Sequence, residues 1–472
     1  MEEDTKYRTF TIFILILLIA IYSRWIGFTN PHNYTFDESL YTQMGLQLNK
    51  NPFNYNSKAV YEYCTNRGRP LPNYLNMPLF KHPPVYCYLI SLSYYILNPS
   101  YLSAFIVSLV FGLVIIIISL TIGIEFFNKN VALLASLLIT IDPIHWLCSE
   151  KIWMETTMTA FIWASLYFLM KAIINRKQNY FIWAGLTTGI AILTKYPAFI
   201  VFPIGFTYAF IYDREVFKSK YFWFWPLVSF VLFVPWLFWN FNIYGSNFFA
   251  AILTAHREIK LNFYLFFLYI STLLLITAGI VYLIRHKTKK QTITSTLSVF
   301  KKSLMPILIL GGLTILFVQP YMLQGVANML NLKYIPVVGW KIGIFKDEPW
   351  YFYIRRIIEL SPFYFIAFLG IFLVRDLKSK TLPLFIAIFW MMPIFITYGN
   401  FQSRYILPTV PAFLIISAYT ITWVFKKISQ FYNKKWLYII LSLILLIMLT
   451  YSFIKTTIVD LQLALPNKVC YF

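Results

Sequence analysis

TFTIFILILLIAIYSRWIGF, residues 9–28, is a long apolar run close to the start of the chain. About 20 mainly apolar residues in an α-helix span the hydrocarbon core of a bilayer. The run is too long for the core of a signal peptide, and it ends in bulky residues where a cleavage site needs small ones. We therefore interpret it as a retained first transmembrane helix.

The composition of the whole chain extends this interpretation. Of the 472 residues, 59% are hydrophobic, 20% are aromatic and only 12% are charged. Such a chain has more apolar surface than the core of a soluble domain can bury. The net charge of +22 does not indicate nucleic-acid binding, because the basic residues fall in short clusters between apolar runs. We predict an all-α polytopic membrane protein.

Thirteen apolar runs are predicted to cross the membrane: 9–28, 101–124, 131–147, 155–171, 180–195, 196–212, 221–243, 262–284, 303–322, 360–374, 382–398, 404–425 and 436–455. The segment 83–98 is shorter and begins with two prolines. If it crossed, the later basic clusters would face outward, against the positive-inside rule. We therefore predict a helix lying on the outer surface there, and a cytoplasmic N-terminus.

This topology places two large loops outside, residues 29–100 and 323–359. The sequence shows no appended soluble domain, no flexible linker and no internal repeat. Residues 1–472 are therefore expected to form one membrane-embedded unit with an outward-facing working surface.

Acidic residues are scarce, 18 against 40 Lys plus Arg, and those away from the cytoplasmic side fall in outer loops or at outer ends of spans. A charge within a bilayer is costly unless it meets water or a partner. Asp142 and Glu155 lie within or at the edge of apolar runs, so both are candidate functional residues. Asp142 precedes Pro143, however, and could instead simply break its helix.

The acidic pair Asp37-Glu38 lies in the stretch NYTFDESLYTQ (33–43), directly after the first span. Thr35 and Glu38 have the spacing of a capping box, in which each side chain accepts the other residue's backbone N–H. This pattern accounts for Glu38. It leaves Asp37 on a first helical turn that favours its ionised form, so a catalytic role for Asp37 stays open.

Further motifs follow in order along the chain: FDESLY (36–41), KHPPVYCYL (81–89), SEKIWME (149–155), GIAILTKYPAF (189–199), PWLFWNFNIYG (235–245), EPWYFYI (348–354) and SRYILPTVP (403–411). The ordered set resembles the C-type (GT-C) membrane glycosyltransferases. The resemblance is to the PMT-like branch, glycosyltransferase family 39, which contains protein O-mannosyltransferases and lipid A aminoarabinose transferases. One departure is Glu155, where many relatives have Asp.

The resemblance implies a GT-C fold of about thirteen spans, with helices of the first outer loop on the membrane surface. It also implies an inverting transfer of a sugar from a dolichyl- or undecaprenyl-phosphate donor to a hydroxyl of a protein or glycolipid. The sugar transfer would take place on the outer face of the membrane, which indicates the plasma membrane.

Particular residues receive roles from the same resemblance. The expected catalytic residues are Asp37, Glu38 and Glu155, with Asp37 as the general base. The expected ligands of the donor phosphate are Arg404, Lys81, His82 and Lys195. The expected substrate contacts are Tyr41, Lys151, Tyr405 and Tyr351.

No cofactor is firmly implied, and the four cysteines show no CxxC spacing. Asp37 and Glu155 could hold a divalent cation through their oxygens, so a divalent cation stays open. The main alternative function is a lipid-linked sugar flippase or another transporter, which would place charges along mid-membrane helices and often show repeated halves. An oligosaccharyltransferase would carry a WWDYG-type motif in a C-terminal soluble domain, and this sequence shows neither.

Overall fold

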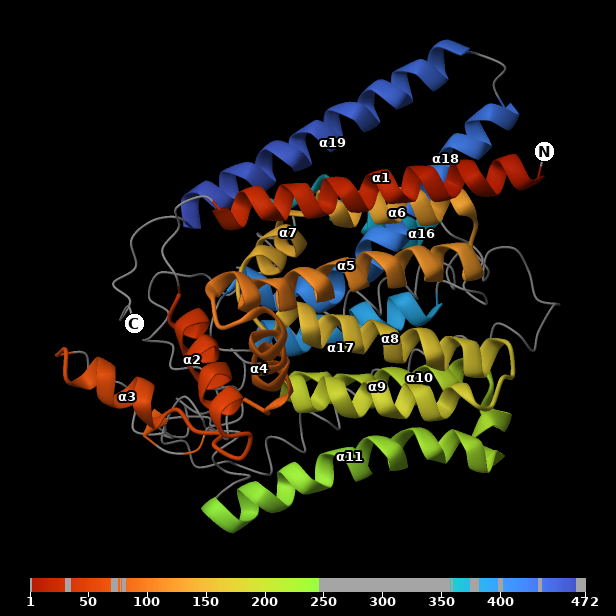
Figure 1. The fold of residues 1–472 in the computed structure, drawn as a ribbon. Helices are drawn as coiled ribbons and strands as arrows, with labels where there is room; N and C mark the ends of the chain where they lie inside the picture. Colours follow the sequence, from red (N-terminus) through yellow and green to blue (C-terminus); the bar gives the residue numbers. More distant parts are fainter. Residues whose placement is uncertain are drawn as a thin grey trace, which may run out of the picture.

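The computed structural model describes residues 2–29, 35–68, 75–76, 78, 82–245, 357, 360–373, 382–397, 402–431 and 435–463. Within these residues the secondary structure consists of helices, without strands. Long helices run roughly along one direction, and the shorter helices α2 (Phe36–Lys50), α3 (Lys58–Thr65) and α4 (Val85–Leu97) gather at one end, on the left of Figure 1. The prediction of an all-α protein is confirmed for the described part of the chain.

Five helical stretches of the described residues are long and apolar enough to cross a membrane. They are most of α1 (Glu2–Thr29), α5 (Tyr101–Phe126), α8 (Glu155–Ile174), α11 (Lys220–Tyr244), and the stretch Ser403–Ile428, which joins η5 (Ser403–Thr409) to α18 (Val410–Phe431). These helices confirm the predicted spans 9–28, 101–124, 155–171, 221–243 and 404–425.

The predicted span 131–147 is broken in its middle. Helices α6 (Lys129–Thr140) and α7 (Pro143–Glu150) meet at a bend of 59°. The Asp142 carboxylate caps α7 by accepting the backbone N–H groups of Ile144 and His145, at 3.1 and 2.9 Å. Pro143 stands at the first position of α7, where its missing N–H is tolerated. Asp142 is therefore the helix breaker that one of the two interpretations predicted.

The other predicted spans within the described residues are helical as well. They correspond to α9 (Tyr180–Thr194), η2 (Tyr196–Ile200) with α10 (Val201–Tyr212), α16 (Pro362–Leu373), α17 (Leu382–Thr397) and α19 (Lys435–Leu463). The short helix η3 (Arg214–Lys218) precedes α11. The predicted spans 262–284 and 303–322 lie outside the described residues, so the total of thirteen stays a prediction.

The segment 83–98 forms α4, which packs against α2. A Cβ on Gly45 of α2 would come within 2.5 Å of the Ile90 side chain, so the glycine permits this close approach. Figure 1 shows α2 and α4 running steeply across the ends of α5 and α8. The 13 residues of α4 give a helix of about 20 Å, too short for a hydrocarbon core of about 30 Å. The position of this helix on the membrane surface stays a prediction.

Helix α8 lies between α5 and α9 in Figure 1, and small polar residues join α8 to α9 and α9 to α11. The Ser165 hydroxyl of α8 lies 2.5 Å from the Thr188 hydroxyl of α9, which also accepts the indole N–H of Trp225 at 3.0 Å. Gly185 and Gly189 let α9 approach α11 closely, as small residues do between membrane helices. This packing brings the start of α8 and the end of α9 to the same end of the bundle.

Candidate active site

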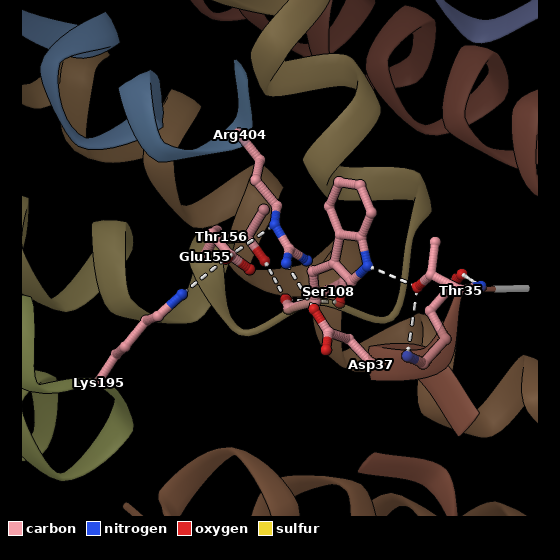
Figure 2. Close-up of polar contacts among 9 residues, drawn as sticks. Thr35, Asp37, Ser108, Glu155, Thr156, Lys195 and Arg404 are labelled. Atoms are coloured by element: carbon pink, nitrogen blue, oxygen red, sulfur yellow. Dashed lines mark hydrogen bonds and ion pairs between the residues drawn. The ribbon is translucent and has the colours of Figure 1, made fainter. Parts of the chain in front are cut away.

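Four charged side chains from four separate segments meet at the end of the bundle near α2 (Figure 2). Arg404 of η5 donates from Nη2 to Asp37 Oδ2, on the first turn of α2, at 2.5 Å. The Nε of Arg404 lies 3.5 Å from Oε1 of Glu155, the first residue of α8. Lys195, at the C-cap of α9, donates from Nζ to the same Glu155 oxygen at 2.8 Å. We call these residues, Asp37, Arg404, Glu155 and Lys195, the ion-pair chain.

The ion-pair chain is largely buried. Glu155, Lys195 and Arg404 are 1%, 6% and 7% exposed, whereas the Asp37 side chain keeps 28% of its surface. Charges so deeply buried persist only when they are paired, and here two carboxylates balance two cations. The second oxygen of Glu155, Oε2, has no hydrogen-bond partner among the described residues. A buried acceptor of this kind suits a ligand that brings its own donor.

Two aromatic rings frame the cations. The Arg404 guanidinium carbon lies 4.5 Å from the ring centroid of Trp153 and 5.3 Å from that of Tyr405. Lys195 Nζ lies 4.8 Å from the Tyr405 centroid. Both cations therefore face the electron-rich surface of Tyr405, an arrangement that stabilises positive charge. Tyr405, expected as a substrate contact, lies within the site.

Thr35 and Glu38 form the predicted capping box at the start of α2. The Thr35 N–H donates to Glu38 Oε2 at 2.7 Å, and the Glu38 N–H donates to the Thr35 hydroxyl at 3.4 Å. Glu38 Oε1 accepts the N–H of Ile152 at 3.2 Å, which joins α2 to the segment before α8. Backbone groups thus bind both oxygens of Glu38, so we expect an anchoring rather than a catalytic role for it.

Asp37 stands outside the capping box and faces Arg404 (Figure 2). Burial alone would raise the pKa of Asp37, but the Arg404 guanidinium, with smaller contributions from His82 and Lys195, lowers this pKa to about 2. The carboxylate is ionised at neutral pH. Its affinity for a proton depends on whether Arg404 stays paired with it.

Tyr41 and His82 lie beside Asp37. Tyr41 follows Asp37 by one turn of α2 and is 2% exposed. Its ring centroid lies 5.8 Å from that of His82 and 5.4 Å from that of Tyr86, both edge-on. Burial raises the pKa of Tyr41 well above its ordinary value, so its hydroxyl remains protonated. Tyr41 and His82, both expected in the site from the sequence, thus lie near Asp37, and their roles stay predictions.

The sequence also predicted three further site residues. Lys151 is 3% exposed at the C-cap of α7, in the same turn as Trp153. Lys81 and Tyr351 lie outside the described residues, so their roles stay predictions. Trp153 was missed by the sequence reasoning, although it stands in SEKIWME between Lys151 and Glu155. An aromatic residue so close to a membrane-edge acid was the available signal.

A divalent cation would need oxygen ligands. The carboxylates of Asp37 and Glu155 are both in contact with Arg404, and Lys195 also binds Glu155. Among the residues that the structure describes, no group of three or more His, Cys, Asp or Glu side chains converges. Arg404 and Lys195 place two positive charges beside these carboxylates.

Comparisons with known proteins identify a matching family model and similar solved folds. Residues 81–239 match the family described as dolichyl-phosphate-mannose-protein mannosyltransferase. That segment includes Glu155 and Lys195 of the ion-pair chain. No curated protein matches this chain significantly in sequence.

Solved structures share the fold at low sequence identity. ArnT from Cupriavidus metallidurans in the apo state is 13% identical, with a TM-score of 0.53, over 96% of this chain and 75% of ArnT. Its structure bound to undecaprenyl phosphate is 14% identical, with the same TM-score of 0.53 and the same 96% and 75% coverage. The archaeal oligosaccharyltransferase AglB from Archaeoglobus fulgidus, in complex with an inhibitory peptide and a dolichol-phosphate, is 18% identical with a TM-score of 0.60. That match covers 98% of this chain but only 57% of AglB.

Fold and site together define a helical membrane protein with a buried cluster of charged residues at one end of its bundle. More particularly, residues 81–239 match the model of a protein mannosyltransferase family, and nearly the whole chain shares its fold with ArnT and AglB. Both likenesses agree with the resemblance predicted from the ordered motifs.

Proposed function

We propose that this chain transfers a sugar from a polyprenyl-phosphate donor to an acceptor hydroxyl, with inversion at the anomeric carbon. The ion-pair chain carries the proposal, because it sets a carboxylate beside two cations at the end of a membrane-embedded bundle. Similar folds support the choice of donor: ArnT was solved with undecaprenyl phosphate and AglB with a dolichol-phosphate. The acceptor would be a hydroxyl of a protein or a glycolipid.

Arg404 and Lys195 would bind the donor phosphate. A guanidinium can hold two phosphate oxygens at once, and Lys195 adds a second positive charge on the other side of Glu155. As Arg404 turns toward the phosphate, Asp37 loses its main counter-ion. The pKa of Asp37 then rises toward its ordinary range, so donor binding itself would convert a weakly basic carboxylate into a better base.

The reaction is a single displacement. The acceptor oxygen forms a bond to the anomeric carbon while the bond from that carbon to the phosphate oxygen breaks on the opposite face. The acceptor proton passes to Asp37, and the released phosphate keeps its negative charge near Arg404 and Lys195. These cations stabilise the leaving group more strongly as its charge grows, which lowers the barrier. Glu155 Oε2 would accept a hydrogen bond from a hydroxyl of the sugar or of the acceptor.

We further propose that the reaction centre faces the outside of the plasma membrane, with the N-terminus in the cytoplasm. Basic residues support this orientation, because α8 runs from Glu155 at the reaction centre to Lys171 in its last turn. Lys218 and Lys220, around the start of α11, lie at the same far end of the bundle as Lys171. Positive loops of this kind face the cytoplasm.

The test is a transfer assay with purified protein in lipid nanodiscs and a radiolabelled polyprenyl-phosphate sugar. Release of sugar onto an added acceptor, or onto water, is expected for the wild type. Asp37→Asn should lower kcat by about 10²- to 10⁴-fold, the range for loss of a general base. Glu62→Gln is the matched control, because Glu62 is an exposed carboxylate of the same loop, paired with Lys58 at 3.6 Å.

Full turnover by Asp37→Asn would refute the assignment of the base. The alternative function, a lipid-linked sugar flippase or other transporter, makes a different prediction in the same preparation. Vesicles would then show movement of the donor lipid between leaflets, with the bond between sugar and phosphate intact.

A further inference from the structure

Trp153 connects the two halves of the reaction centre. It lies in the turn between α7 and α8 and is 6% exposed. Its indole N–H donates to the Thr35 hydroxyl at 3.0 Å, and its ring faces the Arg404 guanidinium at 4.5 Å. One side chain thus touches both the cap of the helix that carries Asp37 and the cation that binds Asp37.

We infer that Trp153 is a positioning residue. It holds Arg404 beside Asp37, and it stays in contact with Arg404 when the partner of Arg404 changes from the Asp37 carboxylate to the donor phosphate. The inference rests on the proposed function of the ion-pair chain. Arg404 and Asp37 are 367 residues apart in sequence, so their contact depends on tertiary packing. Trp153 supplies that packing through one ring face and one N–H.

The Arg404 guanidinium lies over the Trp153 ring while one of its N–H groups pairs with Asp37. Nη2 donates to Asp37 Oδ2, whereas Nε lies 3.5 Å from Glu155 Oε1 without a hydrogen-bond partner among the described residues. A donor phosphate would supply an acceptor for this unused N–H. The Trp153 ring would remain beside the guanidinium during this exchange of partners.

The turn that carries Trp153 is itself fixed. The backbone carbonyl of Trp153 accepts the hydroxyls of Ser108 at 3.3 Å and Thr156 at 3.5 Å. The neighbouring Ile152 N–H donates to Glu38. These bonds tie the turn to α5, α8 and α2, so the position of the indole is set by three helices.

Trp146 offers a matched control within the same molecule. Its indole N–H donates to Glu150 Oε2 at 2.9 Å, and the Arg24 guanidinium lies 5.0 Å from its ring centroid. Arg24, however, donates to Ser23 and contacts His145, at 2.9 Å each, rather than the residues of the reaction centre. The same two interactions are therefore present at Trp146 without the catalytic partners.

The experiment compares Trp153→Phe and Trp153→Leu with Trp146→Phe and Trp146→Leu in the transfer assay. Trp153→Leu removes the ring and the N–H and should lower kcat roughly 10- to 30-fold, as expected for a desolvated cation–π contact. Trp153→Phe keeps an aromatic face and should lower kcat only about 3- to 10-fold, for the lost hydrogen bond. The Trp146 variants should lower the unfolding temperature but keep kcat within about 3-fold.

The pH dependence of kcat/KM separates positioning from simple stability, because it reports groups of the free enzyme. Asp37 is faced by Arg404, His82, Lys195, Glu155 and Tyr41. All five residues are retained in every variant. A shift of the acid limb of the pH profile between variants therefore reports the placement of Arg404. With Trp153→Leu the acid limb should move up toward pH 4, the ordinary range of an aspartate. Trp153→Phe should keep the wild-type limb.

Two failures are distinguishable. If the wild type transfers sugar from no donor tested, the proposed function fails. If the wild type is active and Trp153→Leu keeps the wild-type acid limb, or loses no more kcat than Trp146→Leu, the role of Trp153 is refuted while the proposed function stands.

Discussion

Helix α8 carries a glutamate–lysine ion pair at each end. At its start Glu155 binds Lys195 at 2.8 Å, and the two side chains are 2% and 7% exposed. In its last turn Lys171 binds Glu125 of α5 at 3.1 Å, and those side chains are 17% and 25% exposed. The residue types and the distances are alike. The surroundings of the two glutamates are not.

Glu125 has partners for both of its oxygens. Oε2 accepts the Tyr167 hydroxyl at 2.8 Å, and Oε1 accepts the Asn175 amide at 3.2 Å. Glu155 instead shares Oε1 between Lys195 and Arg404 and leaves Oε2 buried without a partner among the described residues. A satisfied, partly hydrated pair can only anchor a helix end. A dry pair with an extra cation and an unused acceptor can also bind a charged ligand.

The largest difference is expected between Glu155→Gln and Glu125→Gln. Glutamine keeps the shape but removes the charge that balances Arg404 and Lys195. The cations should then bind donor and released phosphate more tightly, so that donor KM falls while kcat falls by about 100-fold. Glu125→Gln should change both constants less than about 3-fold, because Glu125 lies at the opposite end of α8 from Glu155 and its ion pair is partly exposed. Steady-state transfer kinetics measure both.

Equal effects at the two ends of α8 would contradict this interpretation. An increase in donor KM for Glu155→Gln, with kcat unchanged, would mean that Glu155 binds the donor directly and does not balance the cations.

The sequence could predict that Glu155 and Lys195 lie at the same end of the bundle, but not how they pair. Apolar run lengths and basic clusters placed Glu155 and Lys195 at one membrane face, and the motifs singled both out. Their contact depends on how α8 packs against α9, through Ser165 and Thr188. No pattern within either helix specifies that a lysine 40 residues away meets this glutamate rather than Asp37.

Two other differences have similar physical reasons. The sequence predicted one span over 131–147 and left open whether Asp142 breaks it, because average hydropathy does not register a single capping aspartate. The 59° bend at Asp142 follows from local hydrogen bonds. Trp153 was missed because tryptophans are common at membrane interfaces as anchors. Its burial, its hydrogen bond to Thr35 and its distance to Arg404 distinguish it from such an anchor. The capping box was predicted correctly because all of its atoms lie within four residues.

A second prediction separates stability from activity at the buried pair. Lys195→Met alone removes one partner of a buried pair and should lower the unfolding temperature in detergent. The double variant Lys195→Met, Glu155→Leu should recover most of that loss, because apolar replacement of both partners is often neutral. Neither variant should transfer sugar at more than about 1% of the wild-type rate. Removing one group that stabilises charge in the transition state typically lowers kcat by about 10²- to 10³-fold.

The corresponding double variant at the other end, Lys171→Met with Glu125→Leu, is the control. It should leave transfer unchanged, since those residues lie in the last turns of α8 and α5. Substantial transfer by the Lys195→Met, Glu155→Leu variant would show that the buried pair serves the fold alone.

The smallest expected effect concerns the Asp37–Arg404 pair and pH. The pKa of Asp37 is lowered from its ordinary value of 3.8 to about 2 in the folded protein. A lowered folded pKa stabilises the folded state above the unfolded pKa, and this contribution is lost as pH falls from about 4 to 2. This pKa difference corresponds to about 2 kcal/mol in the free energy of unfolding. Solvent screening at the Asp37 side chain, which is 28% exposed, reduces the contribution to about 1 kcal/mol.

Unfolding temperatures of wild type and Asp37→Asn at pH 6 and pH 3 measure this contribution, because other carboxylates titrate equally in both proteins. The wild type should lose slightly more stability on acidification than Asp37→Asn does. A loss of several kcal/mol, specific to the wild type, would mean that the pair is a structural anchor like Lys171–Glu125, and that Arg404 is not readily released to a phosphate. A small loss is what exchange requires, because a cation that must change partners within each turnover cannot be bound tightly to the first one.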